Sequence, residues 1–291
     1  MGEDLLIRFR IRVPEAAGSR EVHCGQKVMC TSGLYRAVMF DPGTRSLRGA
    51  GREFMQRTEY GTQPPSDQML GRPPPPLEVP YTKAKTVVPL PAPDDIAIPA
   101  VDLRDAIEQR ESIRNYAAEP LTLAEIAFLL WCTQGVRQAV DGTFTLRTVP
   151  SAGARHAFET YLLVNRVENV PPGLYRYLAL EHRLAEESRD PEIKRRVAAG
   201  CLNQPHILES AVTFLWTAVP DRMTWRYGER GYRYMHLDAG HVCQNLYLAA
   251  SGVGCGVCAI AAFDDAAMNR LLGIDGERQF LIYVAAVGKK P

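Results

Sequence analysis

The sequence has no long apolar run, which argues against a protein that crosses a membrane as a helix. A spanning helix needs roughly 18 consecutive apolar residues, and no stretch of the 291 residues approaches that length. The first ten residues, Met1–Arg10, also lack the apolar core of a secretory signal peptide. We therefore expect a cytoplasmic protein without a membrane partner.

The sequence also lacks an excess of one charge. Its 34 basic and 33 acidic residues leave a formal net charge of +1, so no general field attracts nucleic acid or an anionic surface. Any anion must be held by a local cluster of residues, and no nucleic-acid partner is expected. The content of 46% hydrophobic and 23% charged residues is that of an ordinary globular protein.

Cysteines are few and irregularly spaced. Their number, seven, is odd, which argues against a disulfide framework and suits a reducing compartment. Cys255 and Cys258 form a CxxC pair, but a redox CxxC follows a strand and opens a helix, whereas this one follows a predicted helix. A zinc site would need two further ligands, and only His241 and Cys243 lie nearby. We interpret the pair as small buried thiols and expect no metal.

The common nucleotide-binding loops are missing. No GxxxxGK[ST] sequence occurs, so a P-loop is excluded. Gly252-Val-Gly-Cys-Gly256 superficially resembles a dinucleotide fingerprint, but that fingerprint needs a strand before it and a helix after it. Here a helix is predicted before and a strand after, so the glycines more simply allow a tight turn.

The composition divides the chain into three parts. Residues 1–51 show no sustained period apart from an alternating run at Leu6–Val13, and their structure is not predicted. Residues 52–100 are expected to form an extended arm, because eleven of the 21 prolines fall between residues 60 and 99. The arm would lie over its own subunit or over a partner subunit, and a PxxP-type ligand is the alternative. Residues 101–291 would form the main domain.

The apolar spacing predicts regular structure from Asp102 onward. Helices are expected where a capping residue precedes an apolar stripe, and strands where short apolar runs are bounded by turns. Their interleaving indicates an α+β fold, in which helices cover a mixed sheet. The expected helices are 103–109, 123–134, one starting at Asp190-Pro191, 232–251 and 264–272; the expected strands are 160–164, 174–177, 183–184, 211–219, 257–260 and 280–287.

Three further segments carry groups suited to chemistry. Arg110-Glu-Ser-Ile-Arg114 places two guanidinium groups and a hydroxyl where they could hold a phosphate, with a solvated surface as the alternative. Residues 150–156 form a Pro-, Ser- and Gly-containing loop that could approach a planar ligand, or a plain turn. Residues 225–234 alternate aromatic and Arg side chains. Such a segment could hold a catalytic tyrosine beside a cation or form the edge of an interface.

In their order along the chain, these segments resemble the nitroreductase superfamily. The series is RxSxR, PSAG, the RYGERGY–AGHVCQN helix, GVGCG with Ala261-Ala-Phe-Asp264, and a last strand that ends Val-Gly288-Lys. It is most similar to the SagB-type branch, the azoline oxidases and their stand-alone relatives. The segment Arg52–Tyr60 and the Pro-rich stretch after it also resemble that branch. The resemblance covers about residues 52–291 and implies a largely antiparallel sheet in a homodimer.

The resemblance also implies FMN as the cofactor and assigns its contacts. The RxSxR segment would hold the phosphate and ribityl chain, the PSAG loop would come from the other subunit, and the loop before Phe263-Asp264 would place backbone N–H groups at flavin N5. Family members often carry Glu-Gly in that last loop, where this chain has Ala-Ala. The implied cofactor-binding residues are Arg110, Ser112, Arg114, Pro150, Ser151, Ala152, Gly153, Ala261, Ala262, and at the C-terminal end Lys289 and Lys290.

A Lys-Tyr pair that handles protons in azoline oxidases corresponds to Arg226 and Tyr227 here. Because arginine stays charged at physiological pH, a proton role would fall to Tyr227 alone. The resemblance implies ping-pong electron transfer from NAD(P)H to a nitroaromatic, quinone or similar acceptor. Two alternatives stay open: oxidation of a peptide azoline to an azole, and a non-catalytic scaffold in a peptide-modifying complex.

Overall fold

The computed structural model describes residues 49–81 and 86–291. The chain divides into two units, Met1–Leu47 and Arg48–Pro291, and all of the described residues lie in the second. The alternating run expected at Leu6–Val13 therefore falls outside the described residues. Among the residues described, no helix is both long and apolar enough to cross a membrane.

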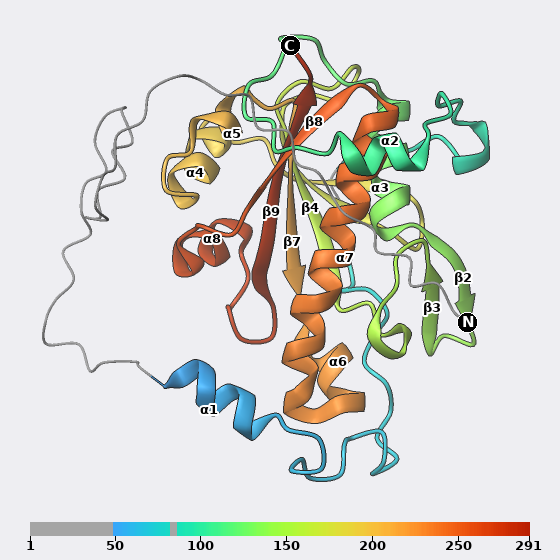
Figure 1. Ribbon diagram of the computed structural model, residues 1–291, viewed down its shortest axis with the longest axis vertical. Coiled ribbons are helices and arrows are strands. Elements are labelled where there is room, and N and C mark those ends of the chain that lie inside the picture. Colours follow the sequence, from blue (N-terminus) through green and yellow to red (C-terminus); the bar gives the residue numbers. More distant parts are fainter. Residues whose placement is uncertain (1–48, 82–85) are drawn as a thin grey trace, which may run out of the picture. The chain divides into compact units, whose positions relative to one another are not determined.

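A seven-stranded sheet forms the centre of the described unit (Figure 1). Its order is β1-β6-β5-β4-β7-β9-β8, and each pair of neighbouring strands is antiparallel. A single parallel bridge joins Ser112 to Val257 at the β8 edge. The strands are β1 (Val87–Pro89), β4 (Phe158–Val164), β5 (Gly173–Leu178), β6 (Arg183–Ser188), β7 (Val212–Ala218), β8 (Cys255–Ile260) and β9 (Phe280–Lys289).

Helices cover both faces of the sheet because side chains along its central strands alternate between two cores. Leu162 of β4 and Trp216 of β7 belong to the core beneath α3 (Leu123–Gln134) and α7 (Gly231–Gly252). Leu163 and Leu215, which are adjacent to those two residues in the sequence, belong to the core on the opposite face, beneath three further helices. Those are α4 (Ile193–Gly200), α5 (Pro205–Glu209) and α8 (Asp265–Leu272).

The remaining elements lie around this framework (Figure 1). A separate hairpin pairs β2 (Val136–Val140) with β3 (Phe144–Arg147). Three short helices are α1 (Ala50–Arg57), α2 (Leu103–Glu108) and α6 (Pro220–Tyr227), and three 3₁₀ turns are η1 (Pro93–Asp95), η2 (Ala152–Ala154) and η3 (Gly228–Arg230).

Most of the predicted elements are present. Asp102 accepts hydrogen bonds from the first turn of α2, and Thr122 with Glu125 forms the expected capping box of α3. The start of α4 differs from the prediction: Asp190 and Pro191 lie in a turn, and the helix begins at Ile193. The last strand runs two residues further than expected, to Lys289. Strand β1, helices α1, α5 and α6 and the β2–β3 hairpin were not predicted. Residues 52–57, expected as part of the extended arm, are helical because they belong to α1.

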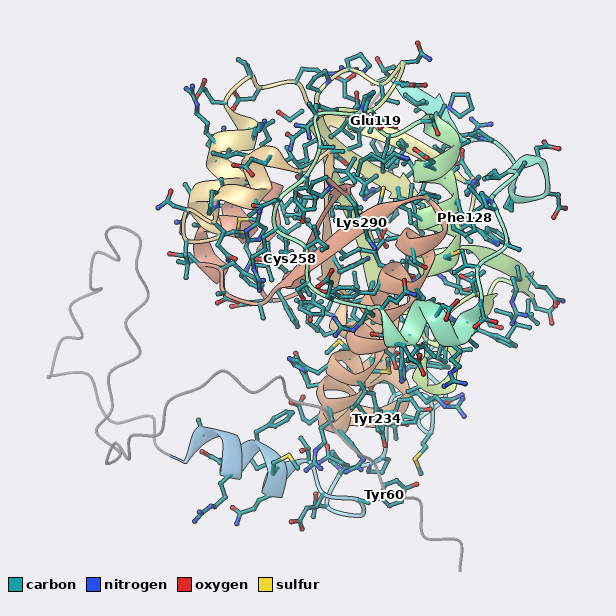
Figure 2. The ribbon with its side chains drawn as sticks, turned by 45° about the horizontal axis from the view of Figure 1, so that its top comes forward. Tyr60, Glu119, Phe128, Tyr234, Cys258 and Lys290 are labelled. Atoms are coloured by element: carbon teal, nitrogen blue, oxygen red, sulfur yellow. The ribbon has the colours of Figure 1, made fainter. Side chains whose placement is uncertain are left out.

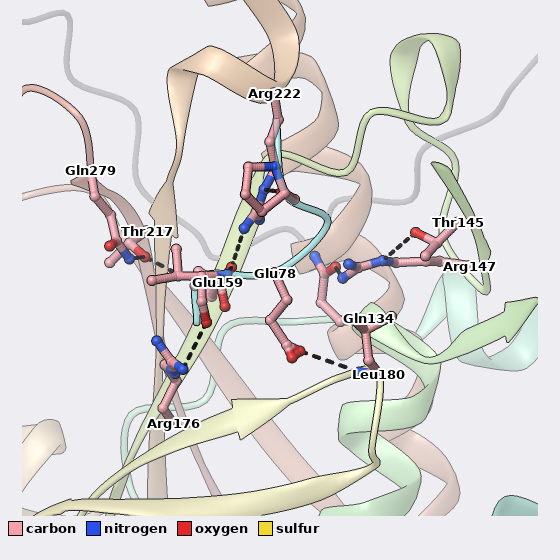
Figure 3. Close-up of polar contacts among 12 residues, drawn as sticks. Glu78, Gln134, Thr145, Arg147, Glu159, Arg176, Leu180, Thr217, Arg222 and Gln279 are labelled. Atoms are coloured by element: carbon pink, nitrogen blue, oxygen red, sulfur yellow. Dashed lines mark hydrogen bonds and ion pairs between the residues drawn. The ribbon is translucent and has the colours of Figure 1, made fainter. Parts of the chain in front are cut away.

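The Pro-rich arm is tied to its own chain by a buried network of charged groups (Figure 3). Glu159 of β4 and Arg222 of α6, both almost fully buried, form an ion pair of 2.5 Å. Glu159 also accepts a hydrogen bond from Val79 N at 2.8 Å, and Arg222 donates to Pro76 O at 2.8 Å. Arg176 of β5 donates to Val79 O at 3.0 Å. These bonds satisfy backbone groups that the prolines leave without strand partners.

Candidate functional site

The Arg110–Arg114 segment lies along the edge strand β8. Ile113 N donates to Val257 O at 3.0 Å, which continues the parallel bridge at Ser112. The close approach depends on Gly256, since a Cβ placed there would lie 2.5 Å from Ile113 Cβ. One glycine of the GVGCG sequence therefore lets the RxSxR segment lie against the sheet.

Tyr247 of α7 organises this segment, although the sequence did not single it out. Its hydroxyl lies 3.0 Å from Ser112 Oγ and accepts a hydrogen bond from Ala259 N at 3.0 Å. The Arg110 guanidinium lies over the Tyr247 ring, 5.4 Å from its centre. Tyr247 thereby fixes two of the three side chains predicted to bind phosphate.

A cavity of about 140 Å³ opens beside these groups. Arg110, Tyr247 and Lys290 are among the residues that line it, together with two acidic residues, Asp105 and Glu111. One cavity is thus lined by both the RxSxR segment and the last residues of the chain. Arg110 and Lys290 are 180 residues apart in the sequence.

The two neighbouring lysines have different surroundings. Lys289 Nζ forms a 2.5 Å ion pair with Glu125 and donates to Val253 O at 2.9 Å. Lys289 therefore connects α3 to the end of α7, whereas Lys290 lines the cavity.

Arg114 is exposed beyond the cavity, on the side of Cys258 and His206. Burial raises the pKa of the Cys258 thiol, and the charge of Arg114 opposes that increase. Burial lowers the pKa of His206, and the same charge lowers it further. Cys258 and Cys255 are buried on β8, where burial raises the pKa of the Cys255 thiol to about 12. Within residues 49–81 and 86–291, no cluster of metal-ligating side chains occurs.

The Pro150–Gly153 loop and the Arg226–Tyr227 pair contact each other directly. Gly153 has a left-handed backbone, with φ of +57°. A Cβ at this position would lie 2.4 Å from the Tyr227 hydroxyl oxygen and 2.9 Å from Arg226 Cδ and Nε. A side chain at this position would therefore strain the left-handed turn and displace Tyr227 and Arg226.

Asp238 of α7 holds the same loop from its other side. Its carboxylate accepts a hydrogen bond from Ala152 N at 3.3 Å, while Ser151 Oγ accepts one from His156 N at 2.9 Å. Burial raises the pKa of Asp238, and the hydrogen bond from Ser151 opposes that increase. The loop is thus fixed by polar contacts to α7 as well as by its own turn.

Tyr227 lies between a cation and a second aromatic ring. The Arg226 guanidinium is 5.6 Å from the centre of the Tyr227 ring, and the Tyr234 ring meets it edge-on with centres 4.8 Å apart. The positive charge is therefore close to the phenol, as the sequence predicted, and Arg226 Nε and the Tyr227 hydroxyl both lie next to Gly153.

Ala261 and Ala262 follow β8 directly and are exposed. The carbonyl of Ala262 accepts a hydrogen bond from Gln204 Nε2 at 3.1 Å, which holds the loop against the turn before α5. They are thus at the surface, at the end of the edge strand along which the RxSxR segment lies.

Within one chain the predicted site residues form two groups, not one. The first contacts α7 at Tyr247 and the second contacts it at Asp238, about 14 Å apart at the usual helical rise. In Figure 2, Lys290 and Tyr234 lie toward opposite ends of α7. The structure therefore assembles each group but does not join them within a single chain.

Comparison with known proteins identifies the family. The nitroreductase family profile matches residues 107–289. A nitroreductase homologue of Methanocaldococcus jannaschii, MJ1384, is 34% identical over 193 residues, which cover 66% of this chain and 93% of that protein. The trifolitoxin-processing protein TfxB of Rhizobium leguminosarum bv. trifolii is 33% identical over 126 residues, 42% of this chain. The match spans only 34% of TfxB.

Solved structures show the same fold. A nitroreductase homologue from Anabaena variabilis superposes with a TM-score of 0.56 at 30% identity, over 65% of this chain and 38% of that one. The E. coli microcin synthetase McbBCD complex gives a TM-score of 0.52 at 19% identity, over 82% of this chain and 86% of that one, which shows the fold alone. The resemblance seen in the sequence is confirmed, and the chain belongs to the nitroreductase family.

Proposed function

We propose that this chain is an FMN-dependent oxidoreductase that works as a homodimer. It would take electrons from NAD(P)H and pass them to an electron-poor acceptor such as a nitroaromatic or a quinone. The observation that carries the proposal is the cavity shared by Arg110, Tyr247 and Lys290. This cavity brings Arg110 of the RxSxR segment and Lys290, two of the residues predicted to bind phosphate, together beside β8, the strand that leads to Ala261.

The donor set fits the phosphate end of a flavin mononucleotide. The Arg110 guanidinium and the Lys290 ammonium supply two positive charges, while Asp105 and Glu111 of the same lining carry two negative ones. The Ser112 hydroxyl, held by Tyr247 beside the cavity, supplies a further donor. FMN would contribute the hydride chemistry when bound, whereas the chain contributes position and charge. Tyr227 would hold or deliver a proton beside the Gly153 turn.

The size of the cavity favours a site shared between two subunits. Its volume of about 140 Å³ is smaller than the roughly 300–1,000 Å³ of a typical ligand pocket, so one chain encloses only part of the cofactor. The remainder would lie over exposed groups such as Arg114 and Ala261 and would be covered by the partner's copy of the 150–153 loop.

Helix α7 offers a surface for that partner. Leu237 is 61% exposed, and Gly240, His241 and Gln244 are exposed at helical spacing along the same face. A dimer of this kind should bury more than about 2,000 Å² in total. Light scattering should give about twice the chain mass, and a stable yellow monomer would contradict the proposal.

Two relatives favour a second candidate, oxidation of a peptide azoline to an azole. TfxB processes trifolitoxin, and the microcin synthetase complex was solved with its precursor peptide bound. In that reaction Tyr227 would act as the base, because arginine side chains do not serve as bases at physiological pH. A scaffold without catalysis is the third candidate, favoured by Ala-Ala at 261–262.

Cofactor content and colour test the proposal. The purified protein should be yellow, release FMN on heating, and be bleached by NADH or NADPH without oxygen and recoloured by a quinone. A yellow protein that NAD(P)H does not bleach, but that converts an azoline peptide, would favour the second candidate. A colourless protein without measurable FMN affinity would favour the scaffold.

A further inference from the structure

A second concave surface lies beside the Gly153–Tyr227 contact. It is a groove of about 420 Å³, and four separate segments line it. Those segments are the Pro-rich arm (Gln68, Pro74), the tip of the β2–β3 hairpin (Thr143, Phe144), the loop after Ser151 (Gly153, Ala154, Arg155) and α6 (Trp225, Arg226). Its volume is that of a small-molecule pocket.

The groove carries two positive charges and no carboxylate among its lining residues. Arg155 donates to Thr143 O at 3.0 Å and to Gly153 O at 3.3 Å, which occupies two of its five N–H donors. Within the part of the chain that the structure describes, neither Arg155 nor Arg226 forms an ion pair. Partial burial and the nearby charge of Arg226 lower the pKa of Arg155.

The walls of the groove are aromatic and fixed in place. The Arg155 guanidinium lies 5.0 Å from the centre of the Trp225 ring, and Phe144 and Pro74 supply further flat apolar surface. Gln68 N donates to Trp225 O at 2.8 Å, and Trp225 Nε1 donates to Arg72 O at 3.0 Å. The arm is thus bonded twice to Trp225 of α6, which preorganises the groove.

We propose that this groove binds a small aromatic carboxylic acid, with its carboxylate on Arg155 and Arg226 and its ring against Trp225 and Phe144. A carboxylate matches the guanidinium fork and neutralises two like charges that have no other counterion in the groove. A planar ring matches the aromatic walls. The proposal rests on the proposed function, because the groove adjoins Tyr227, and it makes acid-bearing aromatics the preferred acceptors.

Binding of benzoate and benzamide to the purified holoprotein tests the groove apart from turnover. Calorimetry should show at least about tenfold tighter binding of benzoate, since the amide has the same shape without the charge. Arg155→Gln should remove most of that preference, a loss of about 10- to 100-fold in benzoate affinity. Arg137→Gln is the matched control, because Arg137 is an exposed arginine of the neighbouring hairpin that does not line the groove.

Reduction of 4-nitrobenzoate and 4-nitrobenzamide separates the two proposals. We expect a lower KM for the acid in the wild type, and a ratio of kcat/KM values near one in Arg155→Gln. If benzoate binds selectively but neither the nitro compounds nor a quinone is reduced, the groove assignment stands and the proposed function fails. If both are reduced equally well and benzoate binds no better than benzamide, the function stands and the groove assignment is wrong. Equal losses of benzoate affinity in Arg155→Gln and Arg137→Gln would also refute the groove assignment.

Discussion

Replacing Gly153 with alanine should separate activity from stability. The substitution adds one methyl group at a left-handed residue, φ +57°, and places it 2.4 Å from the Tyr227 hydroxyl oxygen. The hydroxyl must retreat by about 1 Å to reach ordinary van der Waals contact. Arg226, 2.9 Å from the new Cβ at its Cδ and Nε atoms, must also give way.

The stability cost should be modest because the displaced atoms belong to side chains that can rotate. A left-handed non-glycine residue costs about 1–2 kcal/mol. Gly273→Ala is the matched control: Gly273 has φ of +70°, but no atom lies within 4 Å of a Cβ placed there. The two variants share the backbone strain and differ in the contact with Tyr227 and Arg226.

Turnover should distinguish the two variants. A misplacement of about 1 Å near a reacting group can cost about 100-fold in rate. We expect Gly153→Ala to lose about 10- to 100-fold in kcat, and Gly273→Ala to stay within about twofold of the wild type. Urea denaturation and steady-state reduction of a nitroaromatic measure the two effects on the same preparations. Equal turnover in both variants would show that the position of Tyr227 does not limit the reaction.

Three further perturbations address the cofactor, the proton and the pH dependence. Arg114→Ala would remove a charge-assisted contact with the cofactor beyond the phosphate cavity, worth about 1.5–3 kcal/mol, so FMN should be lost roughly 10- to 100-fold more readily on dialysis; unchanged retention would remove Arg114 from the site. Tyr227→Phe should keep full FMN occupancy but slow a half-reaction in stopped-flow by at least about tenfold, whereas a purely structural ring would leave both within about twofold. Burial and the charges of Arg147, Arg155 and Arg222 lower the pKa of His156 to about 3. Below about pH 6.5 His156 is therefore protonated in the unfolded chain but not in the folded chain, so the free energy of unfolding falls as the pH falls. Asparagine tolerates the φ of +43° at this position. His156→Asn should therefore reduce the fall in the free energy of unfolding between pH 6 and 4.5 by about 1.4 kcal/mol per pH unit. Parallel urea midpoints for the two proteins across that range would refute the assignment.

The sequence predicted the elements whose signals are local. The capping box of Thr122 and Glu125 and the cap at Asp264 both lie within four residues of the helices that they start, so one short window contains the whole signal. The buried strands β4 and β7 were predicted because covering a sheet on both faces requires a continuous apolar run.

One missed helix, α6, depends on a distant contact, whereas the missed hairpin does not. Helix α6 contains Arg222, a charged residue that is buried only because Glu159, 63 positions away, pairs with it. The hairpin has a local signal: Asp141 and Gly142 both have positive φ, and an Asp-Gly pair between short strands is a strong signal for a tight turn. That signal could have found β2 and β3.

The candidate site could be proposed from motifs but not from geometry. The sequence singled out the RxSxR and PSAG segments, which stay predictions, but it did not single out Tyr247, because the contact of Tyr247 with Ser112 spans 135 positions. The different contacts of Lys289 and Lys290 also depend on a distant partner, since Glu125 lies 164 positions before Lys289. Neither contact can be predicted from the spacing of neighbouring residues in the sequence.

The contact between Gly153 and Tyr227 has a consequence for how two subunits would share a site. Because both residues belong to one chain, Tyr227 must accompany the 150–153 loop wherever that loop goes. If the loop covers the partner's flavin, Tyr227 serves the partner's flavin too, while Arg114 holds the flavin of its own chain. The phosphate-binding and proton-handling residues of each site would then come from different subunits.

Mixed dimers test this arrangement. A chain with Arg114→Ala and a chain with Tyr227→Phe, assayed after dialysis so that the first has lost its FMN, would form hybrids in which one site has both changes and the other has neither. After unfolding and refolding an equal mixture, half of the dimers should be hybrids with one intact site, which restores about a quarter of wild-type activity. If Arg114 and Tyr227 instead serve the same flavin within one chain, every site in a hybrid carries one change and mixing restores nothing. Recovery of activity therefore decides directly which chain supplies the tyrosine.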